Sequence, residues 1–415
     1  MKKIVLLIFP LILFGKAYDL KALIEHAHMQ NLQIMAKQQS AQSKSKEMQA
    51  QQSVYWPTLD IGASYAHTTP VTLVTPGRTT VGYAKVQMDI YDGGRKKALL
   101  NAKEFVYRAS LLEKEAFVKS VTLNIIQHYY TVKKLQAMIF AMQQQSQELR
   151  AQIRRIRNFV KAGLATSEEI DKLQAVFDDN QYRIADSRLM LQTSREQLRL
   201  LTGLSAEHLK NSHLKEPKKL AFHPYEESKI LQANVKALDA KADAIDAGYR
   251  PQVQIEDSYS RSHYDDVDAL PGFGGDSFLP DHQNKLTLSV NMRLFDNGKM
   301  KKEREAVQYQ KLALASEGAY AIAKQKMQFK LAKSRLGSIR TKLKSAKSAL
   351  RAAKSTYRVI VKKFETGLVD NIAYLDALNK VTFSQARYKE TLCDYEIAKS
   401  IYYYYAGRDP KEYIR

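Results

Sequence analysis

The hydrophobic and polar positions of this chain change their period in the same order in each half. Residues 20–54 carry recurring apolar positions without glycine or proline, which predicts a helix that Pro57 ends. In 59–65 and 84–90, apolar residues then alternate with polar or small ones, as expected for strands with one apolar face. The same alternation returns at 253–259 and 288–294. The pattern therefore predicts four short strands in two pairs.

Each pair of strands is followed by a long helical stretch. No glycine or proline interrupts 95–160, and only two glycines fall within 299–364, so each stretch would form a helix roughly 100 Å long at 1.5 Å per residue. A glycine-containing turn then leads into a second predicted helix, at 167–201 and 370–405. Helices of this length cannot be enclosed in a compact globule, and they indicate an elongated, coiled-coil-like architecture.

Short motifs recur between the two halves. YWPTLDIGASY at 55–65 is matched by YRPQVQIEDSY at 249–259, IYDGG by LFDNG, and VKAGL by FETGL. Gly367 and Gly163 lie 204 positions apart, as do Phe295 and Tyr91. The constant spacing indicates a duplicated chain. We expect a signal segment 1–17, a first repeat 18–203, an equatorial linker 204–224, a second repeat 225–407 and a C-terminal tail 408–415.

The first 17 residues have the features of a secretory signal peptide. A Lys-Lys pair precedes an apolar run at 4–14, and small residues stand at 15 and 17. The alternative is a membrane anchor, but the run is far shorter than the ~20 residues that a spanning helix needs. We therefore expect Sec-dependent export with cleavage after Ala17. The single cysteine, Cys393, has no partner for an internal disulfide.

Strands with one apolar face in an exported protein indicate a membrane β-barrel. Four strands cannot close a barrel, because the narrowest common barrels use about eight, and open edges are not tolerated in hydrocarbon. Three chains related by cyclic symmetry would supply about twelve strands and close the ring. The alternative from the residues alone is a water-soluble helical protein with two exposed hairpins.

The order and spacing of these motifs resemble those of the TolC-type outer membrane efflux proteins over nearly the whole mature chain. The match includes the helix-to-strand prolines Pro57 and Pro251, the strand-to-helix glycines Gly94 and Gly298, and the turns RNFVKAGLATSEEI and RVIVKKFETGLVDNI. The resemblance implies a mostly α fold with a small membrane β part, in which three chains form a twelve-stranded β-barrel continued by an α-helical barrel across the periplasm.

A passive exit duct in the outer membrane of a Gram-negative bacterium is the function that the resemblance implies. Its partners would be a homotrimer's other copies, outer membrane lipid, a periplasmic adaptor (membrane fusion) protein and an inner membrane transporter that supplies the energy. The outer component of a type I protein secretion system is an alternative within this class. An elongated coiled-coil scaffold without a pore is the alternative from another class.

The resemblance also assigns roles to the two helical turns, which lie at the periplasmic tips in such proteins. A glycine there permits a tight turn with positive φ, although termination of the helices is an alternative role for both glycines. The docking of the adaptor falls by position on Gly163, Leu164, Ala165, Thr166, Gly367, Leu368 and Val369.

The periplasmic gate departs from the family pattern. Family members often hold the tips closed with a tyrosine and an arginine of the second turn that reach an acid of the first. Glu169 matches the acid, whereas Phe364 replaces the tyrosine and Val369 the arginine. Of two pore aspartates only Asp376 is matched, since Ala373 stands at the other position. A threefold ring of Asp376 carboxylates would attract cations at the throat.

Charge and chemistry change this picture little. The formal net charge is +22, and 299–363 holds 19 Lys or Arg against 3 Glu. A solvated helix face is the usual meaning of such a run, export argues against nucleic acid as a partner, and a basic lumen would favour anionic cargo. We predict no enzyme and no cofactor, because Cys393 has no activating neighbours and the chain shows neither a phosphate-binding glycine loop nor a Ser-His-Asp triad. We also predict no metal, although a metal site in the His- and Asp-rich loop is the alternative. The His- and Asp-rich stretch at 263–283 is interpreted as a solvated loop that holds ten extra residues.

Overall fold

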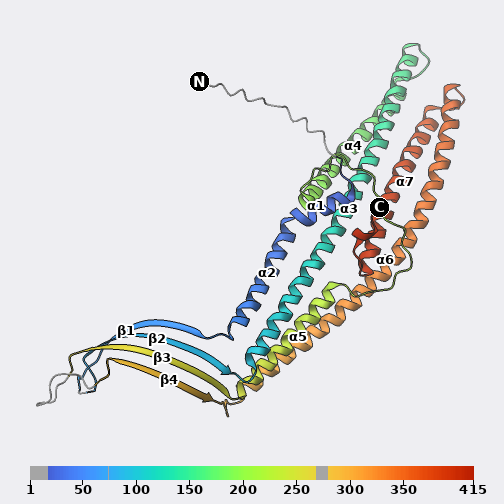
Figure 1. The fold of residues 1–415 in the computed structure, drawn as a ribbon. Helices are drawn as coiled ribbons and strands as arrows, with labels where there is room; N and C mark the ends of the chain where they lie inside the picture. The colour runs from blue at the N-terminus through green and yellow to red at the C-terminus, as the bar shows by residue number, and fades with distance from the viewer. Residues whose placement is uncertain (1–16, 73, 268–278) are drawn as a thin grey trace, which may run out of the picture. The chain divides into compact units, whose positions relative to one another are not determined.

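The computed structural model describes residues 17–72, 74–267 and 279–415 (Figure 1). The predicted signal peptide lies outside the described residues apart from Ala17, and so does the middle of the predicted loop. The described chain forms two compact units. The sheet unit comprises 38–113 and 227–320, and the helical unit comprises the other described residues up to 226 and from 321 onward.

The sheet unit contains a four-stranded antiparallel sheet. Its strands are β1 (Thr58–His67), β2 (Arg78–Tyr91), β3 (Gln252–Asp265) and β4 (His282–Asn291), and they lie side by side in this order (Figure 1). The predicted number and pairing of strands are confirmed. β4 ends three residues before the predicted end, because Asn291 pairs with Gln252 and the preceding Pro251 has no N–H with which to continue the ladder.

The two faces of the sheet differ in polarity. The register places Leu59 beside Val86, and it places Met88, Ile255 and Leu288 in one row. On the opposite face, Lys85 Nζ lies 3.7 Å from a carboxylate oxygen of Glu256. Apolar side chains stay exposed on the first face, as for Ile61 (80%), Leu59 (64%) and Leu288 (65%). Contiguous exposed apolar surface of this kind marks a contact with lipid or protein.

Parts of four helices complete the sheet unit. They are most of α2 (Leu32–Ser53), the first part of α3 (Arg95–Lys161), α5 (Glu226–Asp246) and the first part of α6 (Lys299–Glu365). Ion pairs join neighbouring helices: Lys103 to Glu47 at 2.9 Å between α3 and α2, and Lys311 to Asp239 at 2.6 Å between α6 and α5. Among the described helices, none combines the length and apolar character needed to cross a membrane.

The predicted single helix at 20–54 is wrong, because the structure divides it into α1 (Leu20–Gln30) and α2. Asn31 has an extended backbone, and its side-chain oxygen accepts hydrogen bonds from the N–H groups of Gln33 and Ile34 at 3.0 and 3.1 Å. Its amide also donates to the carbonyl of Leu201 at 2.8 Å. Asparagine at this position therefore caps a new helix instead of continuing the old one.

The helical unit is built from four long helices packed in the order α4, α3, α7, α6. α4 (Ser167–Thr202) packs on α3 through a cluster that includes Ile139 and Ile184. α3 reaches α7 (Asn371–Tyr405) through the ion pair of Lys134 with Glu390, at 3.0 Å. α7 in turn packs on α6 around Tyr395. Both α3 and α6 contain 67 residues, so the predicted long helical stretches are confirmed.

The segment that joins the two halves is fastened to these helices by hydrogen bonds. Tyr130 Oη donates to the carbonyl of Ser212 at 2.9 Å, and buried Lys399 donates to the carbonyl of Leu214 at 2.7 Å. Tyr403 Oη donates to the carbonyl of Lys215 at 3.0 Å. The tyrosines near the end of α7 thus hold backbone of the linker. A short 3₁₀ helix, η2 (Pro410–Tyr413), follows α7.

Candidate functional site

The two helical tips have the same backbone geometry. Gly163 and Gly367 have φ of 70° and 75°, a conformation that glycine adopts without strain. The N–H of Leu164 bonds to the carbonyl of Phe159 at 2.8 Å, and the N–H of Leu368 bonds to that of Lys363 at the same distance. This five-residue return is the usual glycine termination of a helix. Helix termination is therefore part of the role of both glycines.

The tips differ in how the next helix begins. Thr166 precedes α4 without a capping hydrogen bond from its side chain. Asp370, at the matching position before α7, accepts a hydrogen bond from the N–H of Ala373 at 2.9 Å. An aspartate cap is worth about 1 kcal/mol to a helix, so the second tip is the more firmly defined of the two.

Apolar side chains project from both tips. Leu164 is 76% exposed and Leu368 is 74% exposed. Ala165 and Val369 are half-buried, and Ala165 packs against the cluster beneath the tips. The predicted docking residues therefore present one exposed leucine per tip beside a glycine turn. That pair of features suits contact with another protein.

One buried cluster joins the two tips. It includes Leu173 of α4, Leu149 of α3 and Tyr374 of α7, with Phe364 of α6 packed against it. Phe364 and Tyr374 stack with ring centroids 4.9 Å apart, and the Arg155 guanidinium lies 5.2 Å from the Phe364 ring centre. The aromatic ring of Phe364 thus belongs to the cluster. Phenylalanine has no hydroxyl group that would need a hydrogen-bond partner there.

The predicted gate residues are separate from one another in the described structure. The carboxylate of Asp376 pairs with Lys380 one helical turn away, at 2.6 Å. Phe364 lies in the cluster described above. Glu169 is half-buried in the first turn of α4. Among the hydrogen bonds and ion pairs of the described residues, none links Glu169, Phe364 and Asp376.

Sequence reasoning missed Tyr374 at the centre of the cluster. Its ring is 1% exposed, and its hydroxyl is buried without a hydrogen-bond partner among the described residues. The buried side-chain oxygens of Gln152 and Asn371 share this condition. A signal was present, because tyrosines recur at multiples of seven in α7, at Tyr374, Tyr388, Tyr395 and Tyr402, which places them on one face of the helix.

Matching aspartates form the strand-to-helix junctions. Asp92 accepts hydrogen bonds from the N–H groups of Gly94 and Lys96 at 3.1 and 2.5 Å. Asp296, 204 positions later, accepts from Gly298 and Met300, both at 3.0 Å. Gly94 and Gly298 have φ of 90° and 75°. The YDGG and FDNG motifs are therefore aspartate caps on α3 and α6. Pro57 and Pro251 stand immediately before β1 and β3.

The Asp296 cap leads to a pH prediction. The hydrogen bond from Met300 N–H, and others from Tyr249 and Gly298, lower the pKa of Asp296. A lowered pKa contributes stability that is present above the unfolded pKa and is lost as the pH falls through the folded value. We expect Asp296→Asn to flatten the acid side of the stability profile. Urea unfolding of both proteins between pH 3 and 7 tests this, and parallel profiles would contradict it.

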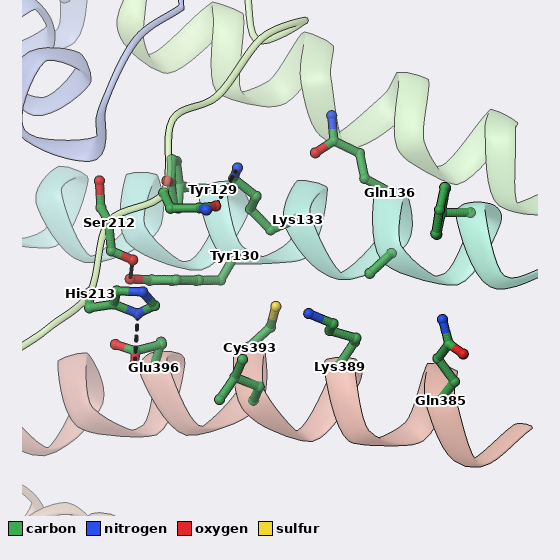
Figure 2. A pocket seen from close by; sticks show the side chains of 14 residues that line it. Tyr129, Tyr130, Lys133, Gln136, Ser212, His213, Gln385, Lys389, Cys393 and Glu396 are labelled. Carbon is green, nitrogen blue, oxygen red and sulfur yellow. Dashed lines mark hydrogen bonds and ion pairs between the residues drawn. The ribbon is translucent and has the colours of Figure 1, made fainter. Parts of the chain in front are cut away.

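A cavity of about 420 Å³ lies between α3, α7 and residues 211–213 (Figure 2). Two of its polar side chains have partners: Lys133 donates to the carbonyl of Leu209 at 2.5 Å, and His213 Nδ1 lies 3.5 Å from a carboxylate oxygen of Glu396. Burial raises the pKa of the Cys393 thiol to about 11, so it stays protonated at neutral pH and is a poor nucleophile.

The His- and Asp-rich region around the predicted loop is partly described. His263 Nε2 lies 3.5 Å from Asp265, and His282 Nδ1 lies 2.7 Å from its neighbour Asp281. Asp268 lies outside the described residues. Where side chains are described, no group of three His, Cys, Asp or Glu is placed to hold a metal ion.

The architecture is shared with solved channel structures. The chain matches the VceC outer membrane protein of Vibrio cholerae with a TM-score of 0.78 and 14% identity over 94% of this chain and 96% of that one. It matches the CmeC channel of Campylobacter jejuni at 0.80 and 13%, over 94% and 85%. For the open MtrE channel of Neisseria gonorrhoeae the values are 0.74 and 13%, over 94% and 89%. No curated protein matches the chain in sequence.

The sequence itself matches a family model. Residues 23–204 match the model described as outer membrane efflux protein. The match covers the first repeat, somewhat less than half of the 415 residues. The TolC-type resemblance is confirmed, and so is the predicted mostly α fold with a small β part, because the outer membrane efflux fold combines long helices with a four-stranded antiparallel sheet in two repeats. Members of this family are channels of the outer membrane.

Proposed function

We propose that three copies of this chain form an exit duct of a tripartite efflux system. The observation that carries the proposal is the sheet with an exposed apolar face and two unpaired edges, β1 and β4. In a bilayer each unpaired backbone group costs several kcal/mol, so the edges require partners. Pairing β1 of one copy with β4 of the next satisfies both edges and closes a ring by cyclic symmetry.

The proposed partners of the duct are a periplasmic adaptor protein and an inner membrane transporter. Leu164 and Leu368 with their glycine turns supply the docking surface on the adaptor side. Transport through the duct is passive, and the energy comes from the inner membrane. We propose no catalysis and no cofactor for this chain. A Sec signal peptide at 1–17, and helices that extend into the periplasm, belong to the same proposal.

The experiment that tests the duct combines two measurements on the signal-cleaved protein. Its mass in mild detergent reports the number of copies, and single-channel recording in planar bilayers reports conduction. A trimer with discrete conductance steps supports the duct. A monomer or dimer without conductance would instead support the elongated coiled-coil scaffold. A type I secretion role would show as capture of a secreted protein in transit by the trimer.

The pairing of Asp376 with Lys380 leads to a two-sided prediction on ion selectivity. Asp376→Asn leaves the Lys380 charge unopposed and is expected to shift the preference of the channel from cations toward anions. Lys380→Gln removes the partner at 2.6 Å and is expected to shift it the opposite way, because the carboxylate field is then uncompensated. Reversal potentials in asymmetric KCl measure both. If both variants have the same reversal potential as the wild type, this residue pair does not lie on the conducting path.

A further inference from the structure

Helix α6 carries a one-sided array of positive charge. Between Gly318 and Phe364 it holds 14 Lys or Arg and no acidic residue. Six of these residues follow one another at spacings of three or four, which places them on one face of the helix, and all six are exposed. The basic ladder consists of Lys344, Lys347, Arg351, Lys354, Arg358 and Lys362.

The ladder has no acidic partner within the described chain. The basic side chains of α6 that form ion pairs there are Lys299, Arg304, Lys311 and Arg340, and none of them belongs to the ladder. Like charges at these spacings destabilise a helix by about 0.2–0.5 kcal/mol per pair. The ladder therefore destabilises α6, and its charges have no partner within the described chain. A binding partner outside the chain would explain the ladder.

The fold does not require the ladder. α3 is the equivalent helix of the first repeat, with the same 67 residues, and its matching positions lie 204 residues earlier. Two of those six positions are basic. The six matching positions are Phe140, Gln143, Gln147, Arg150, Arg154 and Asn158. The same helix packs against its neighbours without this charge, so the ladder is a property of the second repeat.

Within the chain itself, one carboxylate is bound jointly by side chains of α6 and α7. Arg340 stands four residues before the ladder, and its Nη2 lies 3.3 Å from the carboxylate of Glu216, which comes from the linker. Tyr395 Oη of α7 donates to the same oxygen at 2.6 Å, and Lys399 Nζ lies 3.7 Å from the other oxygen. Burial of Glu216 acts to raise its pKa. The hydrogen bond from Tyr395 and the charges of Lys399 and Arg340 outweigh burial, so the pKa of Glu216 is lowered.

The same pair of side-chain types recurs one level closer to the tip. Tyr388 lies seven residues before Tyr395, and Lys347 lies seven residues after Arg340. α6 and α7 are antiparallel, as the contacts Arg340 to Tyr395 and Phe364 to Tyr374 show. Antiparallel packing therefore places Lys347 and Tyr388 at one level. The linker carboxylate fills the first of these levels, and the ladder continues toward the tip beyond it.

We infer that the basic ladder docks an acidic α-helix of the periplasmic adaptor protein. This helix carries carboxylates at spacings of three and four along one face. The inference rests on the proposed function, since it supplies the chemistry by which the periplasmic partner is recognised. Lys362 lies 18 positions after Lys344, which corresponds to about 27 Å along the helix. A helix with matching spacing aligns all its carboxylates with the ladder at once, as Glu216 does singly with Arg340.

The test uses the full signal-cleaved protein and a designed probe. The probe is a fluorescent α-helical hairpin with glutamates at i, i+4 and i+7, and a second hairpin has the same composition with irregular glutamate spacing. The ladder variant combines Lys347→Gln, Arg351→Gln and Lys354→Gln. A control variant removes equal charge from exposed positions of α6 outside the ladder, by Arg335→Gln, Lys342→Gln and Lys363→Gln.

We expect the regular hairpin to bind the ladder variant about tenfold more weakly than the wild type, because three exposed ion pairs together have about this effect. The control variant is expected to change the Kd less than twofold. Equal weakening in both variants, equal binding of the irregular hairpin, or loss of the oligomer in the ladder variant would each overturn the inference. These outcomes would indicate diffuse charge, capture of any polyanion, or a contact between copies.

Conductance measured in the same preparation separates this inference from the proposed function. A preparation that conducts but does not bind the regular hairpin overturns the ladder inference and leaves the duct in place. A preparation that forms no conducting oligomer overturns the duct itself.

Discussion

Gly407→Ala is expected to destabilise the helical unit by about 3 kcal/mol. Gly407 has φ of 80°, where a side chain costs about 1–2 kcal/mol. A Cβ would also collide with the backbone carbonyl of His223. That carbonyl cannot move freely, because the side-chain amide of Gln325 donates to it at 2.9 Å and the His223 N–H bonds to Ala406 at 3.2 Å. Thermal unfolding followed by circular dichroism at 222 nm measures the loss.

A matched control for this substitution is Gly337→Ala. Gly337 lies inside α6, and a Cβ there meets nothing within 4 Å. Alanine is favoured over glycine in a helix interior by about 1 kcal/mol, so the control should be neutral or more stable than the wild type. If both variants lose stability to the same extent, the contact between residues 407 and 223 is not the cause.

Ile61→Arg should prevent the protein from accumulating as an assembled outer membrane channel. Ile61 is 80% exposed on the apolar face of β1, and a lipid-facing arginine at mid-bilayer costs about 2–4 kcal/mol. Three copies in one ring would multiply this cost, since each contributes the same strand. The assembled fraction is measured as heat-resistant oligomer in outer membrane preparations.

Ser64→Arg is the matched control, because Ser64 is exposed on the opposite face of the same strand. There an arginine faces the polar side, where the register already places Lys85 beside Asp60. The assembled fraction should stay near that of the wild type. An assembly defect in Ser64→Arg as severe as that in Ile61→Arg would mean that the apolar face does not contact lipid.

Periodicity predicted the long elements well, because each was specified by many residues. The helix predicted at 95–160 is observed as Arg95–Lys161, and that predicted at 167–201 as Ser167–Thr202. Strand lengths were less predictable. β2 and β3 extend beyond the alternating segments through Arg78 and Asp265, which pair with each other. Arg78, Thr79 and Thr80 are polar on both faces, so the partner strand and not the apolar pattern determines this end.

The candidate site was predictable only in its backbone. Glycine at 163 and 367 predicted the two turns, since helix termination requires a residue that adopts positive φ. The contacts of Phe364 were not predictable, because they depend on which face of α6 meets Tyr374 across the tip. The contact between Arg340 and Glu216 was not predictable either, because the two residues lie 124 positions apart in the chain. Such pairs are determined by packing between distant segments.

The protonated thiol of Cys393 has a practical consequence for mapping the proposed duct. With a pKa of about 11, roughly one thiol in ten thousand is ionised at pH 7. A maleimide reagent at neutral pH would therefore react slowly with the native chain, which has no second cysteine. A cysteine introduced at an exposed site such as Leu164 or Lys354 would carry nearly all the label. Residues along the tips and the basic ladder can thus be probed one at a time without first replacing the native cysteine.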